Sequence, residues 1–355
     1  MEKNYLLWLS LIKGVGSKRA EILLKYFKSA ENIYKANYRE FEQIKGIGAN
    51  FIEKFREAKK ININEKLETL EKLNINFYIK EDEDYPQLLK EIYDPPLILY
   101  VNGSLSKLPM VGIVGSRLCS SYGLTISHEI SKILSENNIC VVSGLARGID
   151  TKSHEGALAG KSPTIAVVAS GVDICYPSEN KGLYEKIKLN GAIISEHFPG
   201  MKPLKEFFPM RNRIISGMSS AVVIVEASSK SGSLITAKKA IEQNRDVYAV
   251  PGNITNELSF GTNSLIRDGA RILTTPMDII EDMNMTFTPI KVEKIKPKFE
   301  DEEQKIYDLI ILETLTIEEI MTRLDGSYQN TQYTLTMLEL KGAATRLPGG
   351  RYSGI

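Results

Sequence analysis

Short apolar runs alternate with longer amphipathic segments through the middle of the chain, between residues 103 and 284. The runs are rich in Val and Ile and end in Gly, Ser or Asn, which is typical of strands, and the longer segments have the apolar spacing of helices. The predicted strands are 111–114, 139–142, 164–169, 192–195, 221–226, 246–250 and 271–273. The predicted helices are 123–136, 152–160, 181–190, 213–218, 233–243 and 263–268. Continuous apolar strands separated by helices predict an α/β domain whose mostly parallel sheet is covered on both faces.

A short motif occurs twice in the N-terminal part of the chain, residues 1–62. Gly14-Val-Gly16 and Gly46-Ile-Gly48 each stand between two amphipathic segments. Glycines permit a tight turn, so the pattern predicts a helical domain of the helix-hairpin-helix or SAM-like kind. The free N–H groups of the following helix suit a phosphate, and four cations accompany the turns: Lys13, Lys18, Arg19 and Lys45. The sequence leaves open whether the turns contact DNA or only join helices.

Two further segments flank the α/β domain. Residues 63–102 contain a predicted helix at 67–73 and short strands at 76–79 and 97–101, and we interpret them as a connector into the domain. Residues 285–300 are charged and contain two prolines, which is typical of a linker. Residues 301–355 then predict three helices and a hairpin, which resemble a winged helix. Its third helix, 329–340, has no Lys or Arg, so contact with DNA and contact with a protein both stay open.

Composition narrows the possibilities. The 355 residues are 43% hydrophobic and 25% charged, which is typical of a soluble protein of two or three domains. The net charge is only +1, so affinity for nucleic acid has to come from local patches. No apolar run reaches the roughly 20 residues needed to span a bilayer, and we see no signal peptide. The three Cys and three His are scattered, so we expect a reducing cytoplasm, no disulfide and no metal site.

The predicted strands end in small and cationic residues. The first is followed by Gly115-Ser116-Arg117, the second by a loop that contains Arg147, and the fifth by Ser231-Gly232-Ser233. Because the carboxyl ends of parallel strands meet at one edge of the sheet, these segments should lie close together. Small residues let backbone N–H groups approach an anion, and the dipole of the following helix favours it. The pattern therefore predicts a phosphate-binding rim; tight strand-to-helix turns are the plainer interpretation.

The stretch 207–219, FFPMRNRIISGMS, combines rings and cations. A guanidinium fits phosphate oxygens and stacks on bases, and a Phe ring accepts an unpaired base. Lys205, Phe208, Arg211, Asn212 and Arg213 therefore predict a cradle for single-stranded nucleic acid. The same residues also fit a plainer alternative, an amphipathic helix with its Phe residues in the core and its Arg residues in solvent.

Signatures of cofactor binding and of catalysis are missing. The first strand is not followed by Gly-x-Gly-x-x-Gly, and no Gly-x-x-x-x-Gly-Lys-Ser/Thr occurs, so we expect no nucleotide cofactor. No Ser/His/Asp or Cys/His set is placed for nucleophilic catalysis. Four acids follow strands, and we expect each to order a loop or a helix start rather than to catalyse: Asp150, Asp173, Glu196 and Glu226.

A series of motifs, taken together, resembles a known family. They are GIVGSR, SGLARGID, GVDICYPSEN, ISEHFPG, FFPMRNRIISGMS, IVEASSKSGSLITAKKA, VYAVPGN and GTNSLIRDGA, in this order between about residues 105 and 275. They closely resemble the DNA-processing protein A (DprA/Smf) family. The resemblance implies an extended Rossmann-like core that binds single-stranded DNA. It also implies a homodimer without an established catalytic activity. The implied function is that of a recombination mediator, which protects incoming DNA and loads the recombinase RecA during natural transformation.

The resemblance also implies site residues. The arginine of the GSR motif is Arg117, the RNR motif supplies Arg211 and Arg213, and a looser Lys-x-x-Phe match gives Lys205 and Phe208. The backbone donors are implied at Gly115, Ser116, Ser231, Gly232 and Ser233. From these residues we expect Arg117→Ala or Arg211→Ala to weaken single-strand binding severely while the fold stays intact.

Two other functions compete with this interpretation. The first is a nucleotide-binding enzyme of the lysine-decarboxylase-like phosphoribohydrolase group, which has a related sheet. That group places a glutamate soon after its glycine-rich turn, whereas here no acid precedes Glu242, which disfavours hydrolysis. The second is a sensor of a small nucleotide whose tandem hairpins bind DNA.

Overall fold

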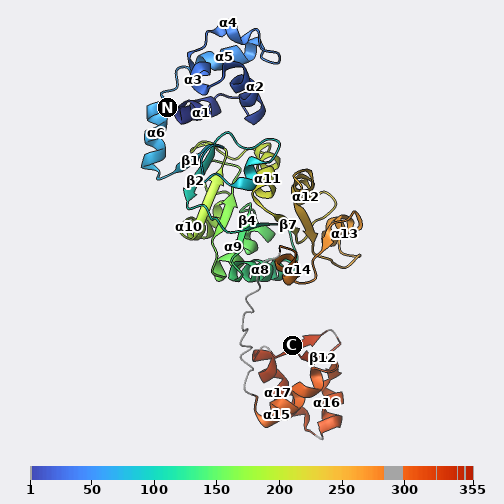
Figure 1. Cartoon of the computed structure of the whole chain (residues 1–355). Coiled ribbons are helices and arrows are strands. Elements are labelled where there is room, and N and C mark those ends of the chain that lie inside the picture. The colour runs from blue at the N-terminus through green and yellow to red at the C-terminus, as the bar shows by residue number, and fades with distance from the viewer. Residues whose placement is uncertain (1, 284–298, 325, 342, 348, 355) are drawn as a thin grey trace. The chain divides into compact units, whose positions relative to one another are not determined.

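The chain folds into two compact units in a computed structural model, residues 1–288 and residues 289–355 (Figure 1). The structure describes residues 2–283, 299–324, 326–341, 343–347 and 349–354. The predicted linker 285–300 therefore lies outside the described residues, except for its last two positions. The predicted boundaries at 62 and 102 stay a prediction, because both fall inside the first unit.

The first unit begins with six helices. They are α1 (Glu2–Ser10), α2 (Ser17–Phe27), α3 (Ala30–Lys35), α4 (Tyr38–Phe41), α5 (Ala49–Ala58) and α6 (Ile63–Lys72). The two glycine motifs make the turns that lead into α2 and α5, as predicted. Gly14 and Gly46 have φ angles of +90° and +91°, which side chains with a Cβ rarely adopt. Trp8, Phe41 and Phe55 lie in the apolar core between these helices.

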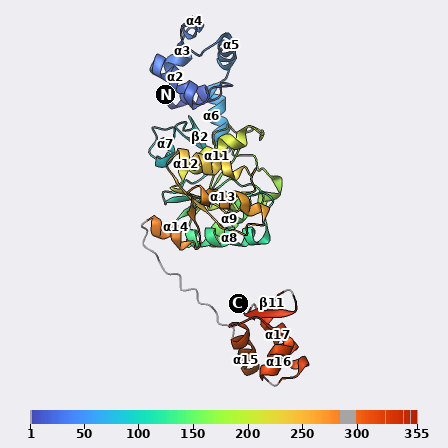
Figure 2. The ribbon, with the colours of Figure 1, turned by 90° about the vertical axis from the view of Figure 1, so that its right-hand side faces the viewer.

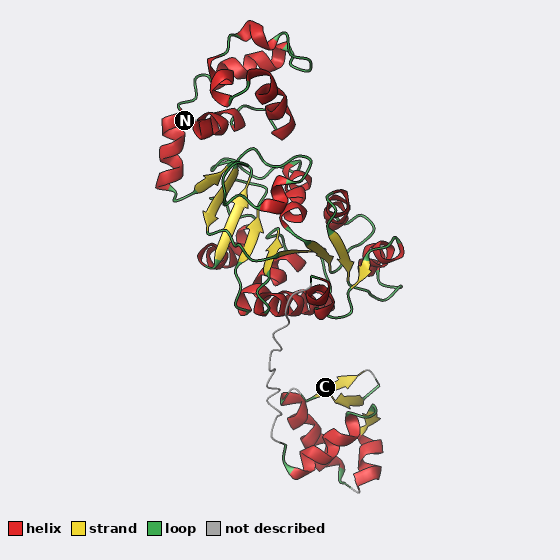
Figure 3. Ribbon diagram, viewed as in Figure 1, coloured by secondary structure: helices red, strands yellow, loops and turns green. Residues whose placement is uncertain are grey.

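A nine-stranded sheet forms the centre of the first unit, in the order β1-β2-β6-β5-β4-β3-β7-β8-β9. Figure 3 shows its strands as yellow arrows with helices around them. Seven of its strands, from β6 to β9 in that order, are parallel, and β1 and β2 add an antiparallel edge. The strands are β1 (Asn76–Tyr78), β2 (Leu99–Gly103), β3 (Met110–Val114), β4 (Cys140–Ser143), β5 (Thr164–Val167), β6 (Gly191–Ser195), β7 (Ala221–Ile224), β8 (Asp246–Ala249) and β9 (Arg271–Ile272). The sequence-based prediction of a mostly parallel α/β sheet is confirmed.

The order of the strands reverses between β3 and β7. From β3 the chain adds β4, β5 and β6 in one direction, and it then returns to place β7 on the other side of β3. Loops that leave the carboxyl ends of these two neighbouring strands run in opposite directions. They leave a crevice between them, which is where open α/β sheets bind ligands.

Helices cover both faces of the sheet (Figures 1 and 2). One face packs against α7 (Gln87–Lys90), α11 (Phe207–Met218) and α12 (Ser233–Glu242). The other packs against α8 (Ser121–Glu136), α9 (Ile149–Ala159), α10 (Lys181–Leu189) and α14 (Met277–Asp282). The helix α13 (Phe260–Arg267) leads into β9. Because strand residues such as Val142 and Val223 are fully buried, the strands show no polar alternation in sequence.

The second unit is a small winged-helix fold. Its elements are α15 (Asp301–Ile310), β10 (Leu315–Thr316), α16 (Ile317–Leu324), α17 (Tyr328–Leu340), β11 (Ala344–Leu347) and β12 (Arg351–Gly354). The three strands pair antiparallel in the order β10-β12-β11, and Ile310, Ile320 and Leu335 are in the core. Of all the helices in the described part of the chain, none is long and apolar enough to cross a membrane.

Candidate functional site

A pocket of about 510 Å³ lies at the point where the strand order reverses. The loops after β3 and β7, the start of α12 and one side of α11 form its walls. Nine of the twelve residues predicted from the sequence line it: Gly115, Ser116, Arg117, Phe208, Arg211, Asn212, Ser231, Gly232 and Ser233. The structure therefore brings together segments that are more than 100 residues apart in the chain.

One stripe of α11 faces the pocket. Phe208, Arg211, Asn212 and Ile215 line it, and their spacing of i, i+3, i+4 and i+7 is that of one helix face. The sequence predicted a helix only from residue 213, whereas α11 begins at Phe207. The motif RNR therefore lies within the helix, and its two arginines cannot face the same side.

Arg211 forms the inner wall of the pocket. Its guanidinium is buried, and Nη1 donates hydrogen bonds to the carbonyl of Gly144 at 2.7 Å and to that of Val167. A Cβ on Gly144 would overlap the guanidinium, so any larger residue at this position requires the Arg211 side chain to move. Burial lowers the pKa of Arg211 to about 10, and the negative charge of Asp150 opposes the shift. The site thus holds a positive charge in a desolvated position at the ends of β4 and β5.

Asp150, at the start of α9, stabilises the charge of Arg211 electrostatically. Its Oδ2 accepts hydrogen bonds from the N–H groups of Gly144 at 3.1 Å and of Ala146 at 3.4 Å. Burial raises the pKa of Asp150, whereas Arg211 and the two backbone N–H groups lower it. The carboxylate therefore orders the loop after β4, as the sequence predicted for an acid that follows a strand.

A half-buried ring, Phe208, and two exposed side chains form the rim of the pocket. The Arg117 guanidinium carbon lies 5.2 Å from the centroid of the Phe208 ring, and the Tyr176 ring centroid is 5.9 Å from the same ring. Arg117 is exposed and makes no ion pair among the described residues, and Tyr176 is 49% exposed. Tyr176 was not predicted as a site residue, although it stands in a strand-exit motif. A planar cation and two rings next to one another can hold a flat, unpaired group by stacking.

The start of α12 contributes small polar groups. Ser231 and Ser233 share a hydrogen bond of 2.8 Å between their hydroxyls, and Gly232 caps the helix. The amide of Asn212 donates to the Gly232 carbonyl at 3.4 Å, which ties α11 to this turn. On the opposite wall, a Cβ on Gly115 would lie 2.6 Å from the Ile149 side chain, so the packing of α9 already requires glycine there.

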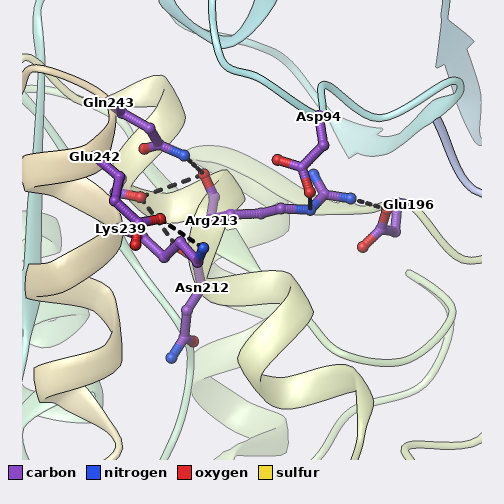
Figure 4. A network of polar contacts seen from close by, with 8 residues as sticks. Asp94, Glu196, Asn212, Arg213, Lys239, Glu242 and Gln243 are labelled. Carbon is purple, nitrogen blue, oxygen red and sulfur yellow. Dashed lines mark hydrogen bonds and ion pairs between the residues drawn. The ribbon is translucent and has the colours of Figure 1, made fainter. Parts of the chain in front are cut away.

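Arg213 is not among the residues that line the pocket, contrary to the row of three site residues predicted from the sequence. Its side chain is buried, and it pairs with Asp94 at 3.2 Å and with Glu196 (Figure 4). Two residues along a helix turn the direction by roughly 200°, so Arg213 faces away from Arg211. Through these two ion pairs, Arg213 connects α11 to the loop that contains Asp94 and to Glu196 at the end of β6.

Arg147 and Lys205 also lie outside this pocket. Arg147 lines a small hollow of about 30 Å³ beside Tyr176 and Phe208, and it makes two hydrogen bonds to the Glu179 carboxylate, at 2.6 and 2.7 Å. Its charge is therefore already paired. Lys205 is exposed just before α11 and is not among the residues that line either cavity.

The acids near the site have structural partners. Asp150 is the only carboxylate among the described residues that line the pocket. Glu226 accepts hydrogen bonds from Ser120, which caps α8, and Glu196 pairs with Arg213. Glu242, the first acid after the turn at Ser231, pairs instead with Lys239 on the surface of α12. Nowhere in the described ranges do His, Cys, Asp and Glu form a group fit to hold a metal ion. Within the described part of the chain, the pocket thus combines the buried guanidinium of Arg211 with small polar residues, and its one carboxylate, Asp150, orders a loop.

Two family models match the chain. The model described as DNA recombination-mediator protein A matches residues 76–284, and the model described as DprA winged helix domain matches residues 293–350. The first match contains the whole pocket.

Known proteins agree with these models. "Protein Smf" of a Synechocystis strain is 38% identical over 289 residues, which are 79% of this chain and 73% of that protein. The crystal structure of DNA processing protein A from Streptococcus pneumoniae is 36% identical, with a TM-score of 0.68, over 80% of this chain and 99% of the other. The DNA processing protein A of Helicobacter pylori, solved to explain its single-stranded DNA binding mode, is 30% identical. Its TM-score is 0.54, over 60% of this chain and 96% of the other.

Proposed function

Because this chain belongs to the DNA recombination-mediator protein A family of DNA-processing proteins, we propose that its pocket binds single-stranded DNA. The backbone phosphates lie against Arg211 and the start of α12, and an unpaired base stacks at the rim on Phe208 and Tyr176. The relative from Helicobacter pylori, described for its single-stranded DNA binding mode, supports this assignment.

The observation that carries the proposal is the stack of Arg117, Phe208 and Tyr176 at the mouth of a pocket with a buried cation. Phosphates require cations, and duplex DNA keeps its bases in its own stack, so exposed rings next to cations favour a single strand. Each base stacked on an aromatic ring contributes about 1–3 kcal/mol. Since the contacts go to the backbone and to ring faces, binding tolerates any sequence.

Two arginines at this rim supply the test. We expect Arg117→Ala to weaken binding of an oligothymidine about tenfold, which corresponds to about 1.4 kcal/mol. The slope of log affinity against log salt should fall by about 0.7 if one phosphate contact is lost. Arg147→Ala should stay within about twofold of the wild type, because Glu179 already neutralises that guanidinium. Fluorescence anisotropy at several salt concentrations, with duplex DNA as competitor, measures both quantities.

Either of two results contradicts the proposal. If a folded Arg117→Ala variant binds with unchanged affinity, the group of Arg117, Phe208 and Tyr176 is not part of the binding site. Equal losses in the two variants would show that a general positive field, rather than the pocket, attracts the strand.

The biological role follows from the family resemblance. We propose that the protein protects incoming single strands in the cytoplasm and loads RecA on them during natural transformation, as a homodimer and without catalysis of its own. Light scattering of the purified chain tests the dimer. The rate at which RecA forms filaments on strands covered by a competing single-strand-binding protein tests the loading. The phosphoribohydrolase alternative is not favoured, because Asp150, the one acid that lines the pocket among the described residues, orders a loop.

A further inference from the structure

Positive charge is concentrated in the N-terminal helices. Residues 1–62 contain 13 Lys and Arg and seven Glu, with no Asp, a net charge of +6, whereas residues 63–355 carry a net charge of −5. Within residues 2–62, the structure shows an ion pair for only two of the 13 cations, Lys3 and Lys35. The near-neutral charge of the whole chain therefore hides a strongly cationic segment next to a slightly acidic remainder.

The two glycine hairpins bring several of these cations together. Arg19, on α2, donates to the carbonyl of Gly14 at 2.5 Å, and its guanidinium carbon lies 5.5 Å from the ring of Phe51 on α5. The ammonium of Lys54 approaches the same turn, at 3.8 Å from where a Cβ on Gly14 would stand. The hydroxyl of Tyr26 also bonds the Gln43 side chain, at 3.2 Å, just before the second turn. Both hairpins thus belong to one surface.

This surface extends to an exposed ring in the loop between α7 and β2. The ammonium of Lys18, at the start of α2, lies 3.9 Å from the centroid of the Tyr93 ring, and Tyr93 is 81% exposed. The next residue, Asp94, is held by Arg213 of α11, the helix whose other side lines the pocket. The ion pair between Arg213 and Asp94 therefore holds the loop that presents Tyr93.

We propose that the hairpin surface, defined by Lys13, Lys18, Arg19, Lys45, Lys54 and Tyr93, is a second binding site for the phosphate backbone of DNA. An unpaired charge binds phosphate at little cost, because no internal partner has to be displaced. The cation above an exposed ring repeats the arrangement of Arg117 and Phe208 and favours a single strand, whose bases are free to stack. The start of α2 and of α5 add N–H groups without side-chain caps.

A charge-matched pair of variants of the full chain tests this site. Lys13→Gln, Lys18→Gln and Lys45→Gln combined remove three exposed cations of the hairpin surface. Arg19 is left in place, because it bonds the turn and packs on Phe51. The control combines Lys161→Gln, Lys181→Gln and Lys186→Gln, three exposed lysines of the α/β part that make no ion pair among the described residues. Both variants lower the net charge by three.

The probes are a long oligothymidine, a short one that only fills the pocket, and a duplex. For the long strand, the hairpin variant should bind about tenfold more weakly, with a salt slope smaller by about 2, since three contacts of about 0.7 each are lost. The control should stay within about twofold, and neither variant should change binding of the short strand. A loss of duplex binding alone in the hairpin variant would overturn the single-strand assignment.

Equal behaviour of the two triple variants on every probe would overturn the second site itself. Tyr93→Ala, which leaves the charge unchanged, should weaken binding of the long strand about fivefold and leave binding of the duplex unchanged. The result does not depend on the pocket: if Arg117→Ala failed to affect the short strand, the difference between the two triple variants would still report on the hairpin surface.

Discussion

The buried charge of Arg211 makes it part of the fold as well as of the site. Its guanidinium bonds two strand-end carbonyls and balances Asp150, so its removal would leave a carboxylate buried without a counter-charge. This changes the expectation, drawn from the sequence, that Arg211→Ala leaves the fold intact. Losing one partner of a buried pair costs about 3 kcal/mol or more. Arg117, which is exposed, is the better probe of binding alone.

Gly144 gives a subtler test of the same charge. A Cβ at this position overlaps the Arg211 guanidinium, and the atoms nearest to it all belong to that side chain rather than to Asp150 or the loop backbone. We expect Gly144→Ala to displace the guanidinium and to weaken binding of an oligothymidine at least fivefold, while thermal unfolding shifts by only a few degrees. Anisotropy and calorimetry on the same sample measure both. Wild-type affinity in this variant would show that the position of Arg211 does not matter.

Two histidines, the buried His154 and the half-buried His197, predict acid sensitivity. Burial, with a smaller effect of Arg213, lowers the pKa of His197 to about 4, and burial with Arg211 lowers that of His154 to about 3. The folded state keeps both neutral while the unfolded state takes up protons below about pH 6.5, so stability falls as pH drops from there toward 4. Each histidine lowers the free energy of unfolding by about 2 kcal/mol at pH 5.

The variant His197→Phe should lose less stability than the wild type between pH 7 and pH 5, by about 2 kcal/mol, because one titrating group is gone. Phe207 stacks on the His197 ring, and a Phe side chain preserves that contact. Urea unfolding at the two pH values measures the difference. Identical pH dependence in the two proteins would mean that His197 is protonated as readily in the folded state as in the unfolded one.

At the scale of elements, sequence patterns predicted the strands better than the side-chain directions. Apolar runs locate β3, β4 and β7, and parallel strands necessarily end at one edge, so the shared pocket of Gly115, Arg117 and Ser231 followed from the pattern. The direction of Arg211 and Arg213 depends on where α11 begins, and Pro209 and the polar RNR motif concealed its first turns. The stripe of residues 208, 211, 212 and 215 was the signal available.

The first turn of α12 allows the backbone contribution to be separated from side chains. Gly232 has a φ angle of −62°, and a Cβ there meets no atom within 4 Å. Gly232→Ala keeps the N–H group and should bind single strands within about twofold of the wild type. Gly232→Pro removes the N–H at a φ angle that proline adopts, and we expect at least fivefold weaker binding. If both variants bind alike, and calorimetry shows both folded, the start of α12 donates nothing to the strand.

For the whole molecule, the two units have different surfaces. The pocket and the hairpin surface both belong to residues 1–288. In the winged-helix unit, α17 carries no Lys or Arg, which disfavours a DNA-reading role and leaves contact with a protein as our interpretation. Composition over the whole chain concealed the charge of the hairpin surface, because the net charges of residues 1–62 and of residues 63–355 have opposite signs and nearly cancel.

The most direct test of the pocket is to find where a bound base lies. A single-stranded oligonucleotide with a photoreactive thymine analogue is cross-linked to the full-length protein, and the modified peptides are identified by mass spectrometry. At a protein concentration near the wild-type Kd, we predict cross-links at Phe208 and Tyr176, which decrease strongly in Arg117→Ala and persist in Arg147→Ala. Cross-links confined to residues 301–354, or spread over the surface without those two rings, would contradict the account.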